Sequence, residues 1–365
     1  LVQRPELKFP AFQPCQLRGS DAMFDLIGHG DVLLHHPFDS FTPVLELIKQ
    51  AAEDPNVLAI KQTLYRTGRD SPIVEHLVQA ARNGKDVTVV VELLARFDEE
   101  ANLGLAGRLQ EAGVQVVYGV VGFKTHAKML LIVRREGRRL RRYVHLGTGN
   151  YHSGTARGYT DLGLMTAHPG IGADVHQVFM QLSGLAPAIE LKHLLQSPFT
   201  LYAGVLERIE REAAHKMNAI NEPRVIRALY AASQAGVEID LIVRGACTLR
   251  PGVPGVSDNI RIRSIVGRFL EHHRVYWFGN DGKPDLYCAS ADWLERNLLH
   301  RVETCFPILD RALAQRVREE ALDNYLADNV DAWELQPDGS YVRHAPAEGE
   351  APHSAQSWLL EKICG

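Results

Sequence analysis

The sequence predicts an α/β protein made of two similar domains, and three observations lead to this fold class. Short runs of β-branched residues alternate with amphipathic segments along the first 120 residues, which is the order that builds α/β sheets with parallel neighbours. The same pattern returns about 150 residues later. The composition, with 45% hydrophobic and 23% charged residues, is that of an ordinary globular protein.

The first half of the chain shows clear starts and ends for its elements. Thr42-Pro43 and Ser71-Pro72 each combine a capping residue with a Pro at the start of a helix. The β-branched run at 87–92 is typical of a buried strand. The expected elements are, in order, a strand at 32–34, a helix at 42–52, a strand at 57–62, a helix at 72–83, a strand at 87–92, a helix at 99–112, a strand at 114–117 and a hairpin with arms 127–133 and 143–146.

The second half is expected to begin with helices, which dominate from about 173 to 218. Glu222-Pro223 then opens a further helix, and Asp310 caps a last amphipathic one. The segment 337–354 is rich in Pro, Gly and acidic residues and is expected to be loose. The remaining expected elements are a strand at 237–243 and a hairpin with arms 274–278 and 286–289.

An internal duplication divides the chain. Gly84 and Gly236 each precede a β-branched strand and lie 152 residues apart, whereas His126 and His272 each precede a hairpin and lie 146 residues apart. We therefore expect two domains, each a mixed, largely parallel sheet flanked by helices, related by pseudo-twofold symmetry. The expected boundaries are a linker from upstream domains at 1–11, a first domain at 12–189, a second domain at 190–341 and a C-terminal tail at 342–365.

Charge and cysteine content exclude several classes of protein. The formal net charge of −4 gives no global positive field, so nucleic acid is not an expected partner. The longest stretch without a charged residue, 175–189, contains Gly184 and Pro187, which argues against a membrane-spanning helix. Five scattered cysteines are typical of reduced thiols in the cytoplasm. Because residue 1 is Leu, we expect a piece of a longer protein.

Two histidine–cation pairs are the strongest candidates for chemistry. Alternate residues of a strand point to the same face, so His126 projects together with Lys128. His272 projects with Arg274 for the same reason. An imidazole nitrogen can attack phosphorus while the neighbouring cation stabilises the negative oxygens, so the pairs predict an anionic, phosphorus-centred substrate.

The turns that follow the two hairpins differ between the halves. The turn at 147–150 offers backbone N–H groups and the Asn150 amide to phosphate oxygens. In the corresponding turn of the second half, Asp292 would repel such oxygens. This difference favours His126 as the nucleophile and leaves His272 as an acid/base or a phosphate clamp.

The spacing of the two pairs resembles the phospholipase D superfamily, whose signature His-x-Lys-x4-Asp occurs twice. Here Val133 occupies the first Asp position, and Arg274 replaces the second Lys. Since the superfamily Asp orients its histidine, a phosphodiesterase of this kind is an alternative rather than the leading interpretation.

A longer set of motifs resembles the type one polyphosphate kinase family, a divergent branch of the phospholipase D fold. The matching segments are 31–38, 60–66, 95–100, 124–128 and 159–161. The resemblance covers the two C-terminal catalytic domains of that family and implies reversible transfer of the ATP terminal phosphate to inorganic polyphosphate through a phosphohistidine. A catalytically incompetent fragment that binds polyphosphate or nucleotide is the remaining alternative.

The resemblance also implies roles for individual residues and Mg²⁺ as cofactor. His126 would carry the phosphoryl group, and His272 would be the second catalytic histidine. Arg66 and Arg96 fall at the family's Mg²⁺ positions, but a guanidinium has no lone pair for a metal, so we expect both to bind phosphate beside the ion. Nucleotide and phosphate contacts are implied for Tyr159, Arg244, His272, Arg66, Arg96, Arg274 and Asn150.

The expected partners are therefore ATP or ADP and polyphosphate, with a homo-oligomer for the full-length protein and a cytoplasmic location, free or peripherally bound to a membrane. His35 and His36 are expected to pack or shape a loop. The Arg-rich hairpin tip at 134–142 is expected to be exposed to solvent. The alternative, functional interpretation is that its arginines guide a polyanion chain.

Overall fold

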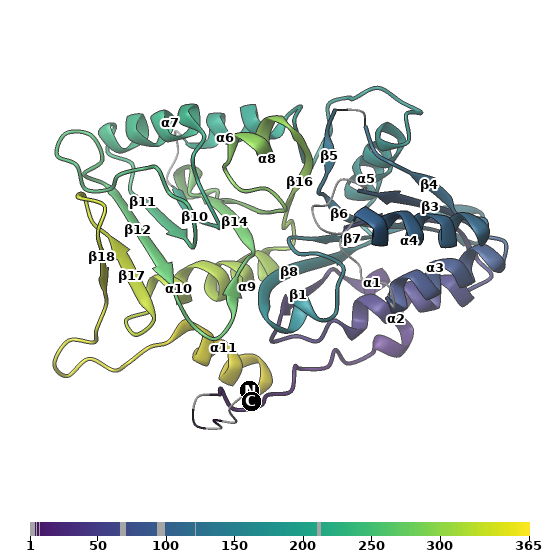
Figure 1. Cartoon of the computed structure of the whole chain (residues 1–365), viewed down its shortest axis with the longest axis horizontal. Helices are drawn as coiled ribbons and strands as arrows, with labels where there is room; N and C mark the ends of the chain where they lie inside the picture. The colour runs from purple at the N-terminus through teal and green to yellow at the C-terminus, as the bar shows by residue number, and fades with distance from the viewer. Residues whose placement is uncertain are drawn as a thin grey trace.

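Two β-sheets, each flanked by helices, organise the chain (Figure 1). The computed structural model describes residues 8–65, 71–92, 99–120, 122–209 and 213–365, together with Arg4 and Glu6. The predicted fold class, an α/β protein made of two similar domains with a mixed sheet and flanking helices in each, is confirmed.

The first sheet has the strand order β1-β8-β7-β6-β2-β3-β4. Its strands are β1 (Val32–His36), β2 (Val57–Leu64), β3 (Asp86–Val91), β4 (Gln115–Val117), β6 (Lys128–Glu136), β7 (Arg139–Gly147) and β8 (Tyr159–Thr166). Its helices are α1 (Met23–His29), α2 (Thr42–Glu53), α3 (Pro72–Arg82), α4 (Glu99–Glu111) and α5 (Pro169–Leu182).

The second sheet follows the path β18-β17-β12-β11-β10-β14-β15-β16, and β9 also pairs with β16. Its strands are β9 (Leu195–Ser197), β10 (Ala213–Met217), β11 (Ile239–Val243), β12 (Ile260–Ile265), β14 (Arg274–Phe278), β15 (Asp285–Ala289), β16 (Arg301–Pro307), β17 (Ala332–Leu335) and β18 (Tyr341–Arg343). Its helices are α6 (Leu201–Ile209), α7 (Pro223–Gln234), α8 (Glu295–Leu299), α9 (Arg311–Arg318), α10 (Asn324–Leu326) and α11 (Ala355–Cys364).

The order of strands repeats between the two sheets, as the duplication predicts. The path β1-β8-β7-β6-β2-β3-β4 corresponds, strand for strand, to β9-β16-β15-β14-β10-β11-β12. Both sheets are mixed, but the expectation that they are largely parallel is wrong. Among the described residues, parallel pairing within each domain is confined to three neighbouring strands, β2-β3-β4 and β10-β11-β12. The hairpins and the strand next to them pair antiparallel, because tight turns reverse the chain.

Two further expectations about local structure need correction. The region from 173 to 218 is not dominated by helices throughout, since it contains the strands β9 and β10. The C-terminal tail contains α11, whose Ala355 and Leu359 are completely buried. Both side chains belong to a core cluster that also includes Met129 of the first sheet and Val275 of the second, so α11 is part of the packing between the domains.

Two short strands join the sheets to each other. β5 (Lys124–Thr125) pairs in parallel with β16 of the second sheet. β13 (Leu270–Glu271) pairs in parallel with β8 of the first sheet. Each short strand directly precedes one of the candidate histidines, so the fold places each histidine at the edge of the opposite domain's sheet.

The buried position of α11 leads to a prediction about stability. Replacing Leu359 by Ala should lower the free energy of unfolding by roughly 2–5 kcal/mol, because a fully buried Leu leaves a cavity when it is truncated. Leu185, which is 63% exposed, provides the control: its replacement by Ala should change stability by less than about 0.5 kcal/mol. Urea denaturation of both variants measures the difference, and equal stabilities would show that α11 is dispensable for the core.

Candidate functional site

The first half-site is built around His126, which follows β5 directly. Its ring atom Nδ1 lies 2.9 Å from Oε2 of Glu303, a residue of β16 in the second domain. The backbone N–H groups of His126 and Ala127 both donate to the carbonyl of Val302 at 2.9 Å. The pairing of β5 with β16 therefore sets both the backbone and the ring of His126.

Glu303 is completely buried, and every close partner favours its ionised form. Oε2 also accepts a hydrogen bond from Ser290 Oγ at 2.5 Å, and Oε1 accepts one from Asn297 Nδ2 at 2.7 Å. Burial acts to raise the pKa of Glu303, but His126, the charge of Lys128 and the Ser290 hydrogen bond outweigh it and lower that pKa. A carboxylate held in this way fixes the imidazole as a donor at Nδ1 and leaves the lone pair at Nε2.

The second half-site repeats this arrangement with the domains exchanged. His272 follows β13, and its Nδ1 lies 2.8 Å and 3.0 Å from the two carboxylate oxygens of Asp161, a residue of β8 in the first domain. Asp161 Oδ1 also accepts from Thr148 Oγ1 at 2.7 Å. A Cβ added at Gly149 would come within 2.1 Å of Asp161 Oδ2, so only glycine lets this turn approach the carboxylate.

The pairs Thr148/Ser290 and Asp161/Glu303 are each 142 residues apart, whereas the histidines are 146 apart. The sequence interpretation did not pair either carboxylate with a histidine, and it gave Asp161 no role of its own. The signal that could have found this pairing is a change in the spacing between equivalent residues of the two halves. The second hairpin is four residues shorter than the first, so equivalent residues after the hairpins lie 142 residues apart instead of 146. Val133 stands where the superfamily signature has its Asp. His126 does not need a carboxylate at that position, because Glu303 of the opposite domain orients its ring.

The cations of the two half-sites are both buried and lie in one electrostatic cluster. Lys128 is 2% exposed, and its Nζ donates to the carbonyl of His126. Burial lowers the pKa of Lys128 to about 7, with Arg274 acting in the same direction while Glu303 and Asp161 oppose it. Charged residues of both half-sites shift the pKa of Lys128, so the two half-sites form a single candidate site.

Arg274 is held by a two-point contact that the sequence interpretation did not foresee. Its Nε and Nη2 donate to the two carboxylate oxygens of Asp292, each at 3.1 Å, and Nη1 lies 3.2 Å from His272 Nε2. The expectation that Asp292 repels phosphate oxygens is therefore wrong, since its charge is matched by the guanidinium. Asp292 also accepts from the backbone N–H of Asn218, whose side-chain oxygen accepts from Arg244 Nε at 3.3 Å.

Burial keeps both imidazoles uncharged at neutral pH. It lowers the pKa of His126 to about 4, with Lys128 adding to the effect and Glu303 opposing it. Burial also lowers the pKa of His272, against the opposing effect of Asp161. The neutral state of His126 therefore has burial as its main cause, and the charge of Lys128 makes a smaller contribution.

One tyrosine stands beside each histidine. The ring centroids of Tyr159 and His272 are 5.3 Å apart, and those of Tyr65 and His126 are 5.2 Å apart. Tyr65 was not identified from the sequence, although it directly precedes Arg66. Each tyrosine ring therefore packs against the ring of one histidine.

The remaining predicted site residues are Arg66, Arg96 and Asn150. Arg66 and Arg96 lie outside the described residues. The side-chain oxygen of Asn150 is buried without a hydrogen-bond partner among the described residues, and the N–H of Thr148 donates to Leu162 instead of facing the site. Within the described ranges, no group of three or more His, Cys, Asp or Glu side chains is arranged to hold a metal ion.

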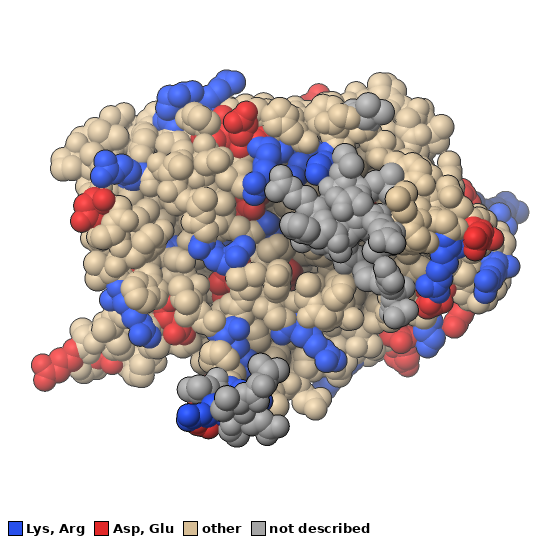
Figure 2. All heavy atoms as spheres, viewed as in Figure 1, with Lys and Arg blue, Asp and Glu red and all other residues tan. Residues whose placement is uncertain are grey.

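The surface outside the site carries both signs of charge. Figure 2 shows Lys and Arg side chains interspersed with Asp and Glu over the visible face. At the hairpin tip, Arg134 pairs with Asp54 and Glu136. His35 is completely buried and pairs with Glu320, consistent with the expected packing role. Over the residues that the structure describes, no helix has the length and apolar content to cross a membrane.

Comparison with known proteins identifies the family of this chain. Two family models match nearly the whole chain: polyphosphate kinase C-terminal domain 1 over residues 22–188 and polyphosphate kinase C-terminal domain 2 over residues 194–356. The chain is 70% identical to the polyphosphate kinase of Xylella fastidiosa strain Temecula1 and 58% identical to that of Pseudomonas aeruginosa, in each case over 100% of this chain and 54% of the relative. It thus spans about half the length of the curated relatives that it matches.

Solved structures give the same assignment. The polyphosphate kinase of Porphyromonas gingivalis superposes with a TM-score of 0.90 at 35% identity, over 99% of this chain and 58% of that one. Phosphatidylserine synthase of Haemophilus influenzae shares the fold, with a TM-score of 0.55 at 12% identity over 91% of this chain and 92% of the synthase. With both C-terminal domain models matched in sequence and the fold matched in three dimensions, the chain belongs to the polyphosphate kinase family and comprises its two C-terminal domains.

Proposed function

We propose that this chain transfers the terminal phosphate of ATP to and from polyphosphate through a phosphohistidine at His126. The observation that carries the proposal is the contact of His126 Nδ1 with the buried carboxylate of Glu303. This contact fixes the proton on Nδ1, so Nε2 offers a lone pair. An uncharged, oriented imidazole next to a buried cation is the arrangement that nucleophilic attack on phosphorus requires.

The reaction then has two balanced steps. In the first, Nε2 of His126 attacks the γ-phosphorus, the bond from phosphorus to the bridging oxygen breaks, and ADP leaves with that electron pair. In the second, a terminal oxygen of polyphosphate attacks the phosphohistidine, and the nitrogen–phosphorus bond breaks to return the electron pair to Nε2. The proton on Nδ1 stays in place throughout, and Glu303 stabilises the positive charge on the ring while nitrogen is bonded to phosphorus.

The surrounding side chains support this chemistry by position. Lys128 contacts His126 and Arg274 contacts His272, and we assign both cations to stabilising the oxygens of the transferring group. His272 already has Arg274 Nη1 against its Nε2, so we assign it to acid/base or clamping work rather than attack. We assign the nucleotide contacts to Tyr159, which lies beside His272, and to Arg244, which bonds to Asn218 next to Asp292.

In this proposal, Mg²⁺ binds to the substrate rather than to carboxylates of the protein. The described carboxylates nearest the histidines, Asp161, Glu303 and Asp292, are each engaged by a histidine or arginine, so they do not form a metal site. We propose that the ion is carried on the phosphate oxygens of ATP. Arg66 and Arg96 stay predicted phosphate clamps.

The assignment of the nucleophile predicts which histidine is labelled by ATP. His126→Ala should abolish acid-labile, base-stable labelling by γ-labelled ATP and Mg²⁺, because the attacking nitrogen is gone. His272→Ala should slow turnover while leaving the label on His126. Peptide mapping of the labelled chain locates the phosphate. Label on His272, or label that survives in His126→Ala, would overturn the assignment; absence of label in the unaltered chain would favour a binding fragment without catalysis.

The lowered pKa of Lys128 predicts a pH dependence. The charged form of Lys128 is present below its pKa of about 7 and is lost as the pH rises through that value. We therefore expect kcat/KM for polyphosphate to fall above about pH 7, because this ratio reports groups of the free enzyme. Bound phosphate favours the charged lysine, so the corresponding fall in kcat should lie at higher pH. On the acid side, His126 stays neutral until the pH approaches about 4.

Lys128→Arg provides the control for this prediction, since a guanidinium keeps its charge across the range. The variant should lose the fall in kcat/KM above about pH 7, whatever its absolute rate. If kcat/KM of the unaltered chain stays level from about pH 6 to about pH 9, Lys128 does not supply the titrating charge.

A further inference from the structure

A buried polar network surrounds the residue that directly precedes the second histidine. Its centre is Glu271, the last residue of β13, which is 3% exposed. Three side chains donate hydrogen bonds to its carboxylate: Lys216 Nζ at 2.5 Å, Thr160 Oγ1 at 2.9 Å and Gln356 Nε2 at 2.5 Å. All three partners are donors, so the carboxylate of Glu271 is the acceptor in each of these contacts.

Lys216 balances this charge inside the protein. It is a residue of β10, is 1% exposed, and lies with Nζ 3.0 Å from the ring centroid of Tyr325. Burial lowers the pKa of Lys216 to about 8, while Glu271 opposes the shift. Removing either partner of such a pair leaves an uncompensated buried charge, which is costly. The pair therefore has a fixed geometry, unlike an exposed ion pair.

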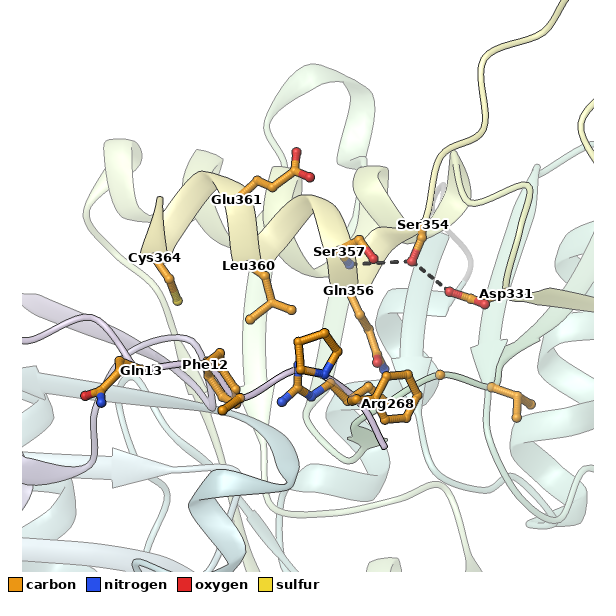
Figure 3. Close-up of a pocket in the computed structure, with 15 residues that line it drawn as sticks. Phe12, Gln13, Arg268, Asp331, Ser354, Gln356, Ser357, Leu360, Glu361 and Cys364 are labelled. Atoms are coloured by element: carbon orange, nitrogen blue, oxygen red, sulfur yellow. Dashed lines mark hydrogen bonds between the residues drawn. The ribbon is translucent and has the colours of Figure 1, made fainter. Parts of the chain in front are cut away.

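Gln356 connects the network to the C-terminal helix. Figure 3 shows its side chain reaching from α11 toward the segment that carries Arg268. Its Oε1 accepts from the backbone N–H of Phe269 at 2.8 Å, and its Nε2 donates to the carbonyl of Phe269 at 2.9 Å as well as to Glu271. One side chain thus hydrogen-bonds both backbone groups of the residue before β13, as a neighbouring strand would.

The network reaches His272 through Thr160. The Thr160 hydroxyl donates to Glu271 and accepts from the backbone N–H of His272 at 3.0 Å. Its two neighbours in β8 are the residues that contact the imidazole: Tyr159 beside the ring and Asp161 at Nδ1. The position of β13 against β8 therefore determines whether His272 meets Asp161.

The first half-site is held differently. There, the backbone N–H of Thr125 donates to Glu92 at 2.8 Å, a residue that follows β3 of the same domain. Only the second histidine, among the described contacts, depends on a side chain from α11. This asymmetry is present although the two half-sites otherwise repeat each other.

We propose that Gln356 and the Lys216–Glu271 pair are positioning residues for His272, through which the C-terminal helix α11 holds β13 in register with β8. The inference rests on the proposed function insofar as His272 takes part in phosphoryl transfer. Its structural part, the placement of β13, is independent of that function. The helix thereby becomes a component of the site as well as of the core.

Gln356→Met tests the proposal, because Met has a similar volume and removes all three hydrogen bonds. We expect kcat for phosphoryl transfer to polyphosphate to fall roughly tenfold to a hundredfold, as for other small misplacements of a reacting group, while ATP still labels His126. In the His272→Ala background the same change should have less than about a twofold effect, since a positioning residue acts only through the group it positions.

Gln181→Met is the matched control. Gln181 is a buried glutamine of α5 that accepts from Gln196 Nε2 at 2.9 Å and has no described contact with β13. Its replacement costs a buried hydrogen bond but should leave kcat within about twofold of the unaltered chain. If Gln356→Met fails to fold, Gln356→Asn can replace it, because Asn keeps the amide on a side chain that is one methylene shorter. Its kcat should fall less than that of Gln356→Met, and the fall should again depend on the presence of His272.

Hydrogen exchange provides a readout that needs no activity. The backbone N–H groups of Leu270 and His272, which donate to Gly158 and Thr160, should exchange at least tenfold faster in Gln356→Met and unchanged in Gln181→Met. Unchanged exchange at β13, or an equal loss of turnover with and without His272, would overturn the proposal. Faster exchange in a chain that never takes label from ATP would instead support the positioning and contradict the proposed function.

Discussion

The exchange of carboxylates between the two domains is the constraint on which the rest of the site depends. Glu303 of the second domain holds His126 of the first, and Asp161 of the first holds His272 of the second. These partners are 177 and 111 residues apart in the chain. Neither domain contains a complete half-site alone, so chemistry and domain packing are coupled. The short strands β5 and β13 make that coupling, because each fixes the backbone beside one histidine.

Burial of the two histidines sets their protonation state. Two imidazoles that would titrate near neutral pH in water are kept uncharged, and their proton is fixed on the nitrogen that faces the carboxylate. The cations Lys128, Arg274 and Arg244 lie among the carboxylates Asp161, Glu303 and Asp292, and Arg301 Nη1 lies 3.9 Å from Glu303 Oε1. We predict that Arg66 and Arg96, which follow β2 and β3 in the sequence, add further positive charge for the polyanion.

Local patterns in the sequence predict much of this fold, and non-local contacts account for what they miss. The alternation of His126 with Lys128 and the duplicate at His272 are visible because strand periodicity is a local property. Glu303 and Asp161 are not, since their partners lie in the other domain and their offset differs from that of the histidines. The strands β9 and β10 were missed because both are short and lie between helices. The helix α11 was missed because it follows a segment rich in Pro and Gly, and its burial depends on surfaces from both sheets.

The tautomers of the two histidines test the account most directly. Nitrogen-15 NMR of the ring nitrogens, assigned with His126→Gln and His272→Gln variants, distinguishes a protonated from an unprotonated nitrogen. At neutral pH both imidazoles should be uncharged, with the proton on Nδ1 and the lone pair on Nε2, because each Nδ1 faces a carboxylate of the opposite domain. Finding the proton of His126 on Nε2, or a doubly protonated ring, would contradict the claim that Glu303 prepares this histidine for attack on phosphorus.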